Sequence, residues 1–92
     1  MGSVVVRVFA FAVAVSAAGQ WEPNTDRPGS DYRRVELANP RPELCRDACW
    51  AEAQCRAFTY ARPGALGPRA LCFLKDAVPP ARPADCCLSA VK

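Results

Sequence analysis

The chain is short, mildly basic and rich in cysteine: its 92 residues carry a net charge of +3, six cysteines and no histidine. This length holds one small domain, and the basic residues are scattered among carboxylates, which argues against a nucleic-acid-binding stripe. Without histidine the chain lacks the commonest general base and the usual nitrogen ligand of zinc. Most hydrolase mechanisms therefore lack their usual catalytic base here.

The first residues are typical of a cleaved signal peptide. Arg7 precedes the apolar run 8–15, and small residues that suit signal peptidase follow. The run is well short of the roughly 20 residues that cross a bilayer, so a membrane anchor is the poorer interpretation. We expect residues 1–18 to be removed and residues 19–92 to form one domain, secreted or periplasmic, without stable membrane insertion.

An irregular lead-in and a strand are expected after the signal. Residues 21–31 are rich in Pro, Gly, Asn and Asp, which predicts an irregular segment with a turn at 27–30. The alternation in residues 31–38 favours a strand. In this strand Val35 and Leu37 face inward, and Tyr32 lies on the other face near an edge.

A short helix is predicted over residues 42–53. A proline in its first turn and a glutamate beside it suit the N-terminal end of a helix. Cys45 and Cys49 fall on its apolar stripe, whereas Trp50 falls on the opposite side. Because Cys45 and Cys49 are one turn apart, their Cβ vectors lie side by side, and we expect each to bond to a different partner on the packed sheet.

Three more strands and two connections are predicted in the rest of the chain. Residues 55–62 have the aromatic and β-branched content of a strand, and a strand is also predicted at 70–78. Residues 63–68 form a turn-rich connection between them. Residues 79–83 are a stiff, proline-rich linker that we do not expect in a central strand, and 86–92 form a short final strand.

The six cysteines predict three disulfides rather than a metal site. Thiols pair and persist in an oxidising compartment, and the x3 and x5 spacings fit zinc ribbons poorly. Each bridge contributes about 3 kcal/mol by restricting the unfolded chain, which is comparable to the net stability of so small a core.

Four segments resemble the PAN/apple domain family: the C-x3-C helix, the third cysteine after x5, the strand CRAFTY and the fourth cysteine in LCFLK. The opening EPNTDRPGSDYRR and the ending VPPARPADCCLSAVK are similar to small exported bacterial members, whose segments typically read DRPGxDY, CRAFTYVxPG and CCxSGVK. The resemblance covers nearly all of the chain after the signal. It implies an α+β fold, a small disulfide-rich domain whose curved antiparallel sheet packs on one α-helix.

The resemblance also implies two of the disulfides. Cys45–Cys72 would tie the helix to the central strand, and Cys49–Cys55 would close the turn that leaves the helix. The apple subgroup has a further bridge between the two ends of the domain. That bridge is not carried over, because no cysteine lies near the mature N-terminus.

Cys86 and Cys87 are left over and adjacent. In a regular strand neighbouring side chains point to opposite faces, so a bond between these two requires a distorted strand. The options are a vicinal bridge, bonds to another molecule, or free thiols. Of these we favour the Cys86–Cys87 bridge.

The family resemblance implies a non-catalytic recognition module that binds a protein or a carbohydrate, with no cofactor and no metal. The exposed aromatic and arginine side chains that suit such an interface are Trp50, Tyr32, Arg62 and Arg69. Trp50 has a second interpretation, since a tryptophan beside a small core can simply cover it.

Two other functions stay open. An envelope thiol-redox protein would use Cys86 and Cys87, because a vicinal dithiol can relay oxidation, although the chain has no C-x-x-C motif. A purely structural domain would bind another subunit. The bacterial, exported origin suggested by the resemblance fits all three functions.

Overall fold

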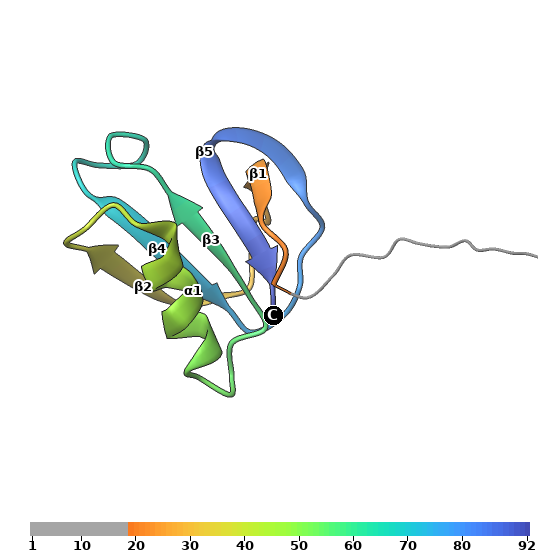
Figure 1. Ribbon diagram of the computed structural model, residues 1–92. Coiled ribbons are helices and arrows are strands. Elements are labelled where there is room, and N and C mark those ends of the chain that lie inside the picture. Colours follow the sequence, from red (N-terminus) through yellow and green to blue (C-terminus); the bar gives the residue numbers. More distant parts are fainter. Residues whose placement is uncertain (1–18) are drawn as a thin grey trace, which may run out of the picture.

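The computed structural model describes residues 19–92, so the predicted signal peptide lies outside the described residues. Within this range the chain forms β1 (Glu22–Asp26), β2 (Asp31–Leu37), α1 (Pro42–Trp50), β3 (Ala57–Ala61), β4 (Ala70–Lys75) and β5 (Arg82–Val91). The strands form one antiparallel sheet in the order β1-β5-β3-β4-β2 (Figure 1). The expected small disulfide-rich α+β domain is confirmed. Its five-stranded sheet is larger than the prediction of a sheet packed on one helix implies.

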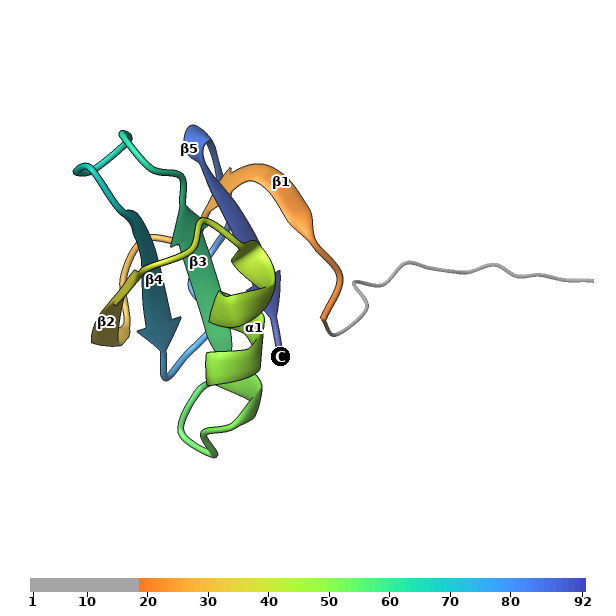
Figure 2. The same cartoon turned by 60° about the vertical axis from the view of Figure 1, so that its left-hand side comes forward.

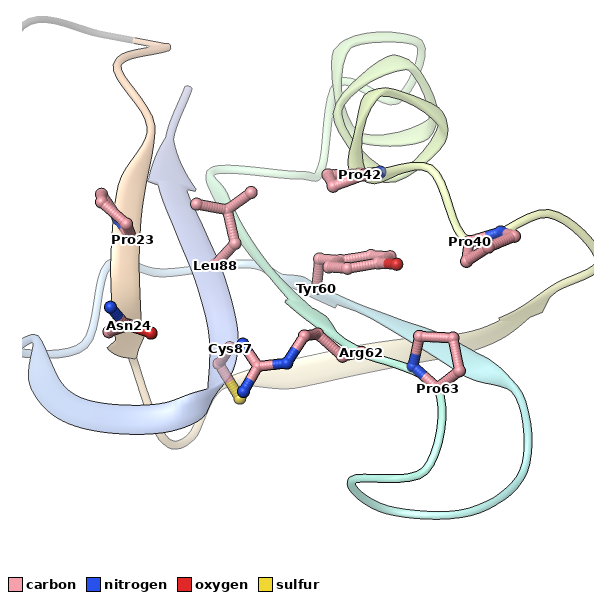
Figure 3. A pocket seen from close by; sticks show the side chains of 9 residues that line it. All are labelled: Pro23, Asn24, Pro40, Pro42, Tyr60, Arg62, Pro63, Cys87 and Leu88. Carbon is pink, nitrogen blue, oxygen red and sulfur yellow. The ribbon is translucent and has the colours of Figure 1, made fainter.

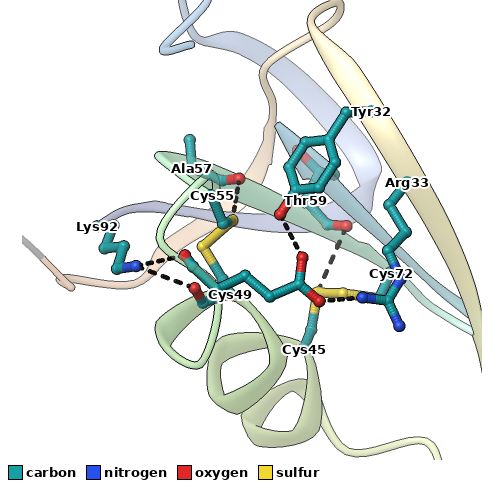
Figure 4. Close-up of a disulfide and its surroundings, with 10 residues drawn as sticks. Tyr32, Arg33, Cys45, Cys49, Cys55, Ala57, Thr59, Cys72 and Lys92 are labelled. Carbon is teal, nitrogen blue, oxygen red and sulfur yellow. Dashed lines mark hydrogen bonds and ion pairs between the residues drawn. A yellow bond between two sulfur atoms is a disulfide. The ribbon is translucent and has the colours of Figure 1, made fainter. Parts of the chain in front are cut away.

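The helix lies against one face of the sheet, over β3 and β4 (Figure 2). Phe58 and Leu74 are fully buried beneath it. Two disulfides fasten the helix: Cys45–Cys72 joins it to β4, and Cys49–Cys55 closes the chain that leaves it, with Cα–Cα distances of 5.4 and 5.2 Å (Figure 4). These are the two pairs that the family resemblance implies.

The helix is shorter than predicted and ends at Trp50 instead of residue 53. The Cys49–Cys55 bond brings the chain back to the end of the helix within six residues, which agrees with an early end of the helix. The Lys92 ammonium also donates to the carbonyl oxygen of Cys49, in the last turn, at 3.2 Å and to that of Glu52, just beyond the helix, at 2.8 Å. A cation is favourable at this negative end of the helix dipole.

The expectation of an irregular lead-in is wrong for Glu22–Asp26, which form the edge strand β1, whereas residues 27–30 lie outside any strand as expected. Its partner β5 lies at the far end of the sequence and supplies the backbone hydrogen bonds that local composition did not predict. Pro23 is tolerated there, because an edge strand has one side on which a missing N–H costs nothing. Pairing with a distant segment therefore overrode the turn-forming composition.

The proline-rich linker is also partly a strand, since β5 begins at Arg82 and includes Pro83. Although β5 lies between β1 and β3, only its residues 87–91 pair with β3. Pro83 pairs with Thr25 of β1 and has no strand on its other side. Proline is therefore excluded only from the residues of β5 that have a strand on both sides, and Pro83 is not one of them.

Cys86 and Cys87 form a vicinal disulfide inside β5. The strand is distorted there, because between two paired positions β1 contributes one residue, Asn24, whereas β5 contributes four, residues 84–87. Asn24 takes a left-handed conformation with φ 52°. This bulge lets two adjacent cysteine side chains meet, which a regular strand forbids.

A buried lysine holds the connection that carries the chain from β1 at one edge of the sheet to β2 at the other. Lys75, at the end of β4, is 2% exposed. Its Nζ donates to Asp31 Oδ1 at 2.5 Å and to the Gly29 carbonyl at 3.2 Å. A buried ammonium requires such partners, so these contacts fix where the crossover passes.

The vicinal bridge is tested by the mass of the unreduced mature protein. We expect a monomer lighter than its fully reduced form by six hydrogens, two for each disulfide, with no thiol that iodoacetamide alkylates before reduction. The matched control is the double variant Cys86→Ser/Cys87→Ser, whose mass should fall by four hydrogens on oxidation. Alkylation at Cys86 or Cys87 in the unreduced protein, or a dimer that separates on reduction, would contradict the bridge.

Candidate functional site

A groove of about 420 Å³ opens on the helix side of the sheet, between the first turn of α1 and the strands β1 and β5 (Figure 3). We call it the proline-lined groove. Its lining residues are Pro23, Asn24, Pro40, Pro42, Tyr60, Arg62, Pro63, Cys87 and Leu88. Four of the nine are prolines, so this wall is stiff and poor in N–H donors.

Tyr60 lies at the centre of the groove and is nearly buried, with 4% of its surface exposed. It pairs across the sheet with Cys72 and Leu88, which sets the position of its ring. Burial raises the pKa of the Tyr60 phenol, the positive charge of Arg62 opposes this rise, and Glu43 adds to it. Among residues 19–92 no partner bonds to its hydroxyl, whereas a buried hydroxyl usually has one.

Arg62 follows directly after β3, and its side chain is exposed at the groove. Its backbone is fixed, because its N–H donates to the Cys86 carbonyl at 3.0 Å and its own carbonyl accepts from Ala65 at 3.1 Å. In the described part of the chain no carboxylate lies within ion-pair distance of its guanidinium. Arg62 thus has a fixed backbone and an exposed guanidinium whose donors are available to a ligand.

Trp50 is not in the groove. Its ring meets Phe58 edge-on, with ring centroids 6.2 Å apart and planes at 69°, while 41% of its surface stays exposed. The expectation that it points away from the packed side of the helix is therefore wrong in part. Trp50 covers one end of the core and leaves one side of its ring in solvent.

Tyr32 also packs against the helix-side core, contrary to the face expected for it. The register of β2 against β4 shifts between Asp31 and Arg33, so Tyr32 lies in a bulge. The bulge places the Tyr32 side chain on the same face of the sheet as that of Arg33. Its hydroxyl donates to Glu52 Oε1 at 2.6 Å, and Arg33 pairs with the same carboxylate (Figure 4). Desolvation and then the Glu52 hydrogen bond raise the pKa of Tyr32 to about 12.

Arg69 lies at the other end of the loop that Arg62 begins, exposed and 4.0 Å from Glu36. Of the four residues predicted for an interface, only Arg62 lines the groove. The other eight lining residues were not predicted for an interface: Asn24, Tyr60, Cys87, Leu88 and the four prolines. No local pattern marks them, because they come from separate segments that only the folded sheet brings together.

All six cysteines are in disulfides, and residues 19–92 contain no group of three or more acidic, cysteine or histidine side chains placed to hold a metal. In the same range no helix is long and apolar enough to cross a membrane.

Truncating Trp50 tests its position over the core. We expect Trp50→Ala to lower the free energy of unfolding by about 1–2 kcal/mol, less than the 3–5 kcal/mol of a buried tryptophan, because much of the ring is in solvent. Urea unfolding measures this. The control is Leu66→Ala, at a side chain that is 59% exposed, which should change stability by less than about 0.5 kcal/mol. Equal effects of the two variants would contradict the packing role.

The raised pKa of Tyr32 predicts a loss of stability at high pH. The neutral phenol is favoured in the folded state, so its stabilisation is complete below the ordinary pKa of 10.0 and is lost as pH rises through about 12. Ultraviolet absorbance of the phenolate in a Tyr60→Phe background reports Tyr32 alone. Glu52→Gln should lower the titration midpoint of the Tyr32 phenol toward 10.0. A midpoint of 10.0 in the protein that keeps Glu52 would refute the assignment.

A model of the PAN domain matches residues 25–75. No curated protein matches the chain. The matched span runs from the end of β1 to the end of β4 and includes the helix and both disulfides that fasten it. It excludes β5, and with it the vicinal disulfide and one wall of the groove. Because the match covers more than half of the 92 residues, the chain belongs to the PAN domain family.

Proposed function

We propose that this chain is an exported, non-catalytic recognition module whose proline-lined groove binds a segment of a partner protein. PAN domains are typically modules that bind proteins or carbohydrates, so the family supports the general role. The observation that favours a protein over a carbohydrate is the composition of the groove wall.

The wall offers few hydrogen-bond donors. Pro23, Pro40, Pro42 and Pro63 have no backbone N–H, and Leu88 adds an aliphatic surface. A sugar ring carries many hydroxyl groups, and each one that is desolvated without a partner costs about 1–3 kcal/mol. An apolar side chain has no such cost and gains from burial. The groove is therefore better suited to a protein segment with an apolar side chain.

Export is supported by the cysteine chemistry. Three disulfides in so small a domain are typical of proteins that fold in an oxidising compartment. The predicted signal peptide agrees with this and belongs to the same proposal. The bacterial origin remains an expectation from the resemblance.

The thiol-redox function is the second candidate, and one observation favours it. Cys86 is partly exposed, so a dithiol reductant can approach the vicinal bond. Cys87, however, is 3% exposed and packs with Ala61 and Leu71 on the face of the sheet away from the helix, so the bridge supports from behind the part of β5 that borders the groove. We therefore assign the bridge first to the shape of the binding site.

Site-specific photo-crosslinking tests the recognition role. A benzophenone side chain at position 63, on the groove, should cross-link a protein from secreted and envelope fractions of the source organism, and an array of neutral glycans should give no signal. The control carries the same group at position 66, an exposed site that does not line the groove. Equal cross-linking at both positions, or a glycan that competes for the groove, would refute the proposal.

A further inference from the structure

We propose that the partner segment is an extended peptide that places an apolar side chain in the middle of the proline-lined groove, a carboxylate at Arg62 and a backbone carbonyl at the Tyr60 hydroxyl. This inference rests on the proposed function and names the chemistry of the ligand at the same site. Three features of the groove carry it.

The first feature is the unsatisfied hydroxyl of Tyr60. The residue is 4% exposed and lines the groove, and its O–H makes no hydrogen bond to another residue among residues 19–92. The other tyrosine of the chain differs, because the Tyr32 hydroxyl donates to Glu52. A phenol is protonated at physiological pH, so this hydroxyl has a proton to donate. The groove therefore lacks an acceptor that a ligand can supply.

The second feature is the charge of the groove. Arg62 is the single charged side chain among its lining residues, and a guanidinium has five donors and no acceptor. Several other arginines of the described chain already have carboxylate partners; the pairs are Arg27–Glu22, Arg33–Glu52, Arg41–Glu43, Arg46–Asp47 and Arg69–Glu36. Because no lining residue is acidic, the groove is complementary to a negatively charged group.

The third feature is that the two donors point in different directions along the groove. Figure 3 shows the Tyr60 hydroxyl directed toward Pro40, whereas the Arg62 guanidinium extends the other way, toward Cys87. Two donors that point apart call for two acceptor groups of the ligand. An extended peptide supplies them, because it presents a backbone carbonyl at every residue and side chains at regular intervals. Between the two donors the Tyr60 ring and Leu88 offer the apolar contact that an aliphatic side chain fills.

A display library of random heptapeptides, selected on the oxidised mature protein, gives the probes for a test. We expect the selected peptides to share an apolar residue close to Asp or Glu. A synthetic copy of the best peptide is then compared with a copy in which Asp or Glu is replaced by Asn or Gln. The acidic copy should bind more tightly at low ionic strength, and the difference should shrink as salt screens the exposed Arg62 charge.

Three variants locate the contacts. Arg62→Gln should weaken the acidic peptide about fivefold and leave the amide copy unchanged, since it removes a charge-assisted contact. Tyr60→Phe, which removes the hydroxyl and keeps the ring, should weaken both copies about fivefold, the effect of one hydrogen bond. Arg69→Gln is the matched control from the other end of the same loop and should change neither affinity. Thermal unfolding of each variant shows that the fold is intact.

The outcomes separate this inference from the proposed function. Peptides that shift the amide resonances of Tyr60 and Leu88 but bind equally well in both copies would overturn the carboxylate contact and leave protein recognition in place. Affinity that is unchanged in Tyr60→Phe would overturn the carbonyl contact in the same way. If no peptide is selected and a uronic-acid oligosaccharide binds through Arg62 instead, both the inference and the protein-binding function fail.

Discussion

The attachment of α1 to the sheet is the constraint on which the rest of this domain depends. A helix of nine residues is too short to be stable alone in water, and a core built around Phe58 and Leu74 is small. The Cys45–Cys72 bond joins the helix to β4 and removes much of the freedom of the unfolded chain, a contribution of about 3 kcal/mol. This bond also sets where the chain enters the helix, and therefore where Pro40 and Pro42 stand in the groove.

The second constraint is the position of β5. Because it inserts between β1 and β3, the last segment of the chain closes the sheet and brings Leu88 beside Tyr60. The bulge at 84–87 shifts the register against β1, and the vicinal disulfide holds the bulge in one conformation. A distortion that weakens a regular ladder thus shapes one wall of the binding site. The family match ends at residue 75 and does not include this wall.

Sequence reasoning was strongest where the signal was local. The helix start, the strand around Phe58 and the separate partners of Cys45 and Cys49 followed from periodicity and geometry, and the pairings came from the family resemblance. It failed where a distant segment decided the outcome. β1 is a strand because β5 pairs with it. Tyr32 turned to the other face because a single-residue bulge reversed its orientation, and periodicity does not show a bulge in advance.

The amino-acid sequence alone determined the size, the cross-linked character, the helix with its two cysteines and the absence of histidine chemistry, since these depend on composition and on residues a few positions apart. Only the tertiary structure decided which residues form a site. Tyr60 and the prolines that line the groove with it come from segments that lie far apart in the chain. Their meeting depends on antiparallel pairing between β3 and β5, and long-range pairing of this kind is not encoded in any local pattern.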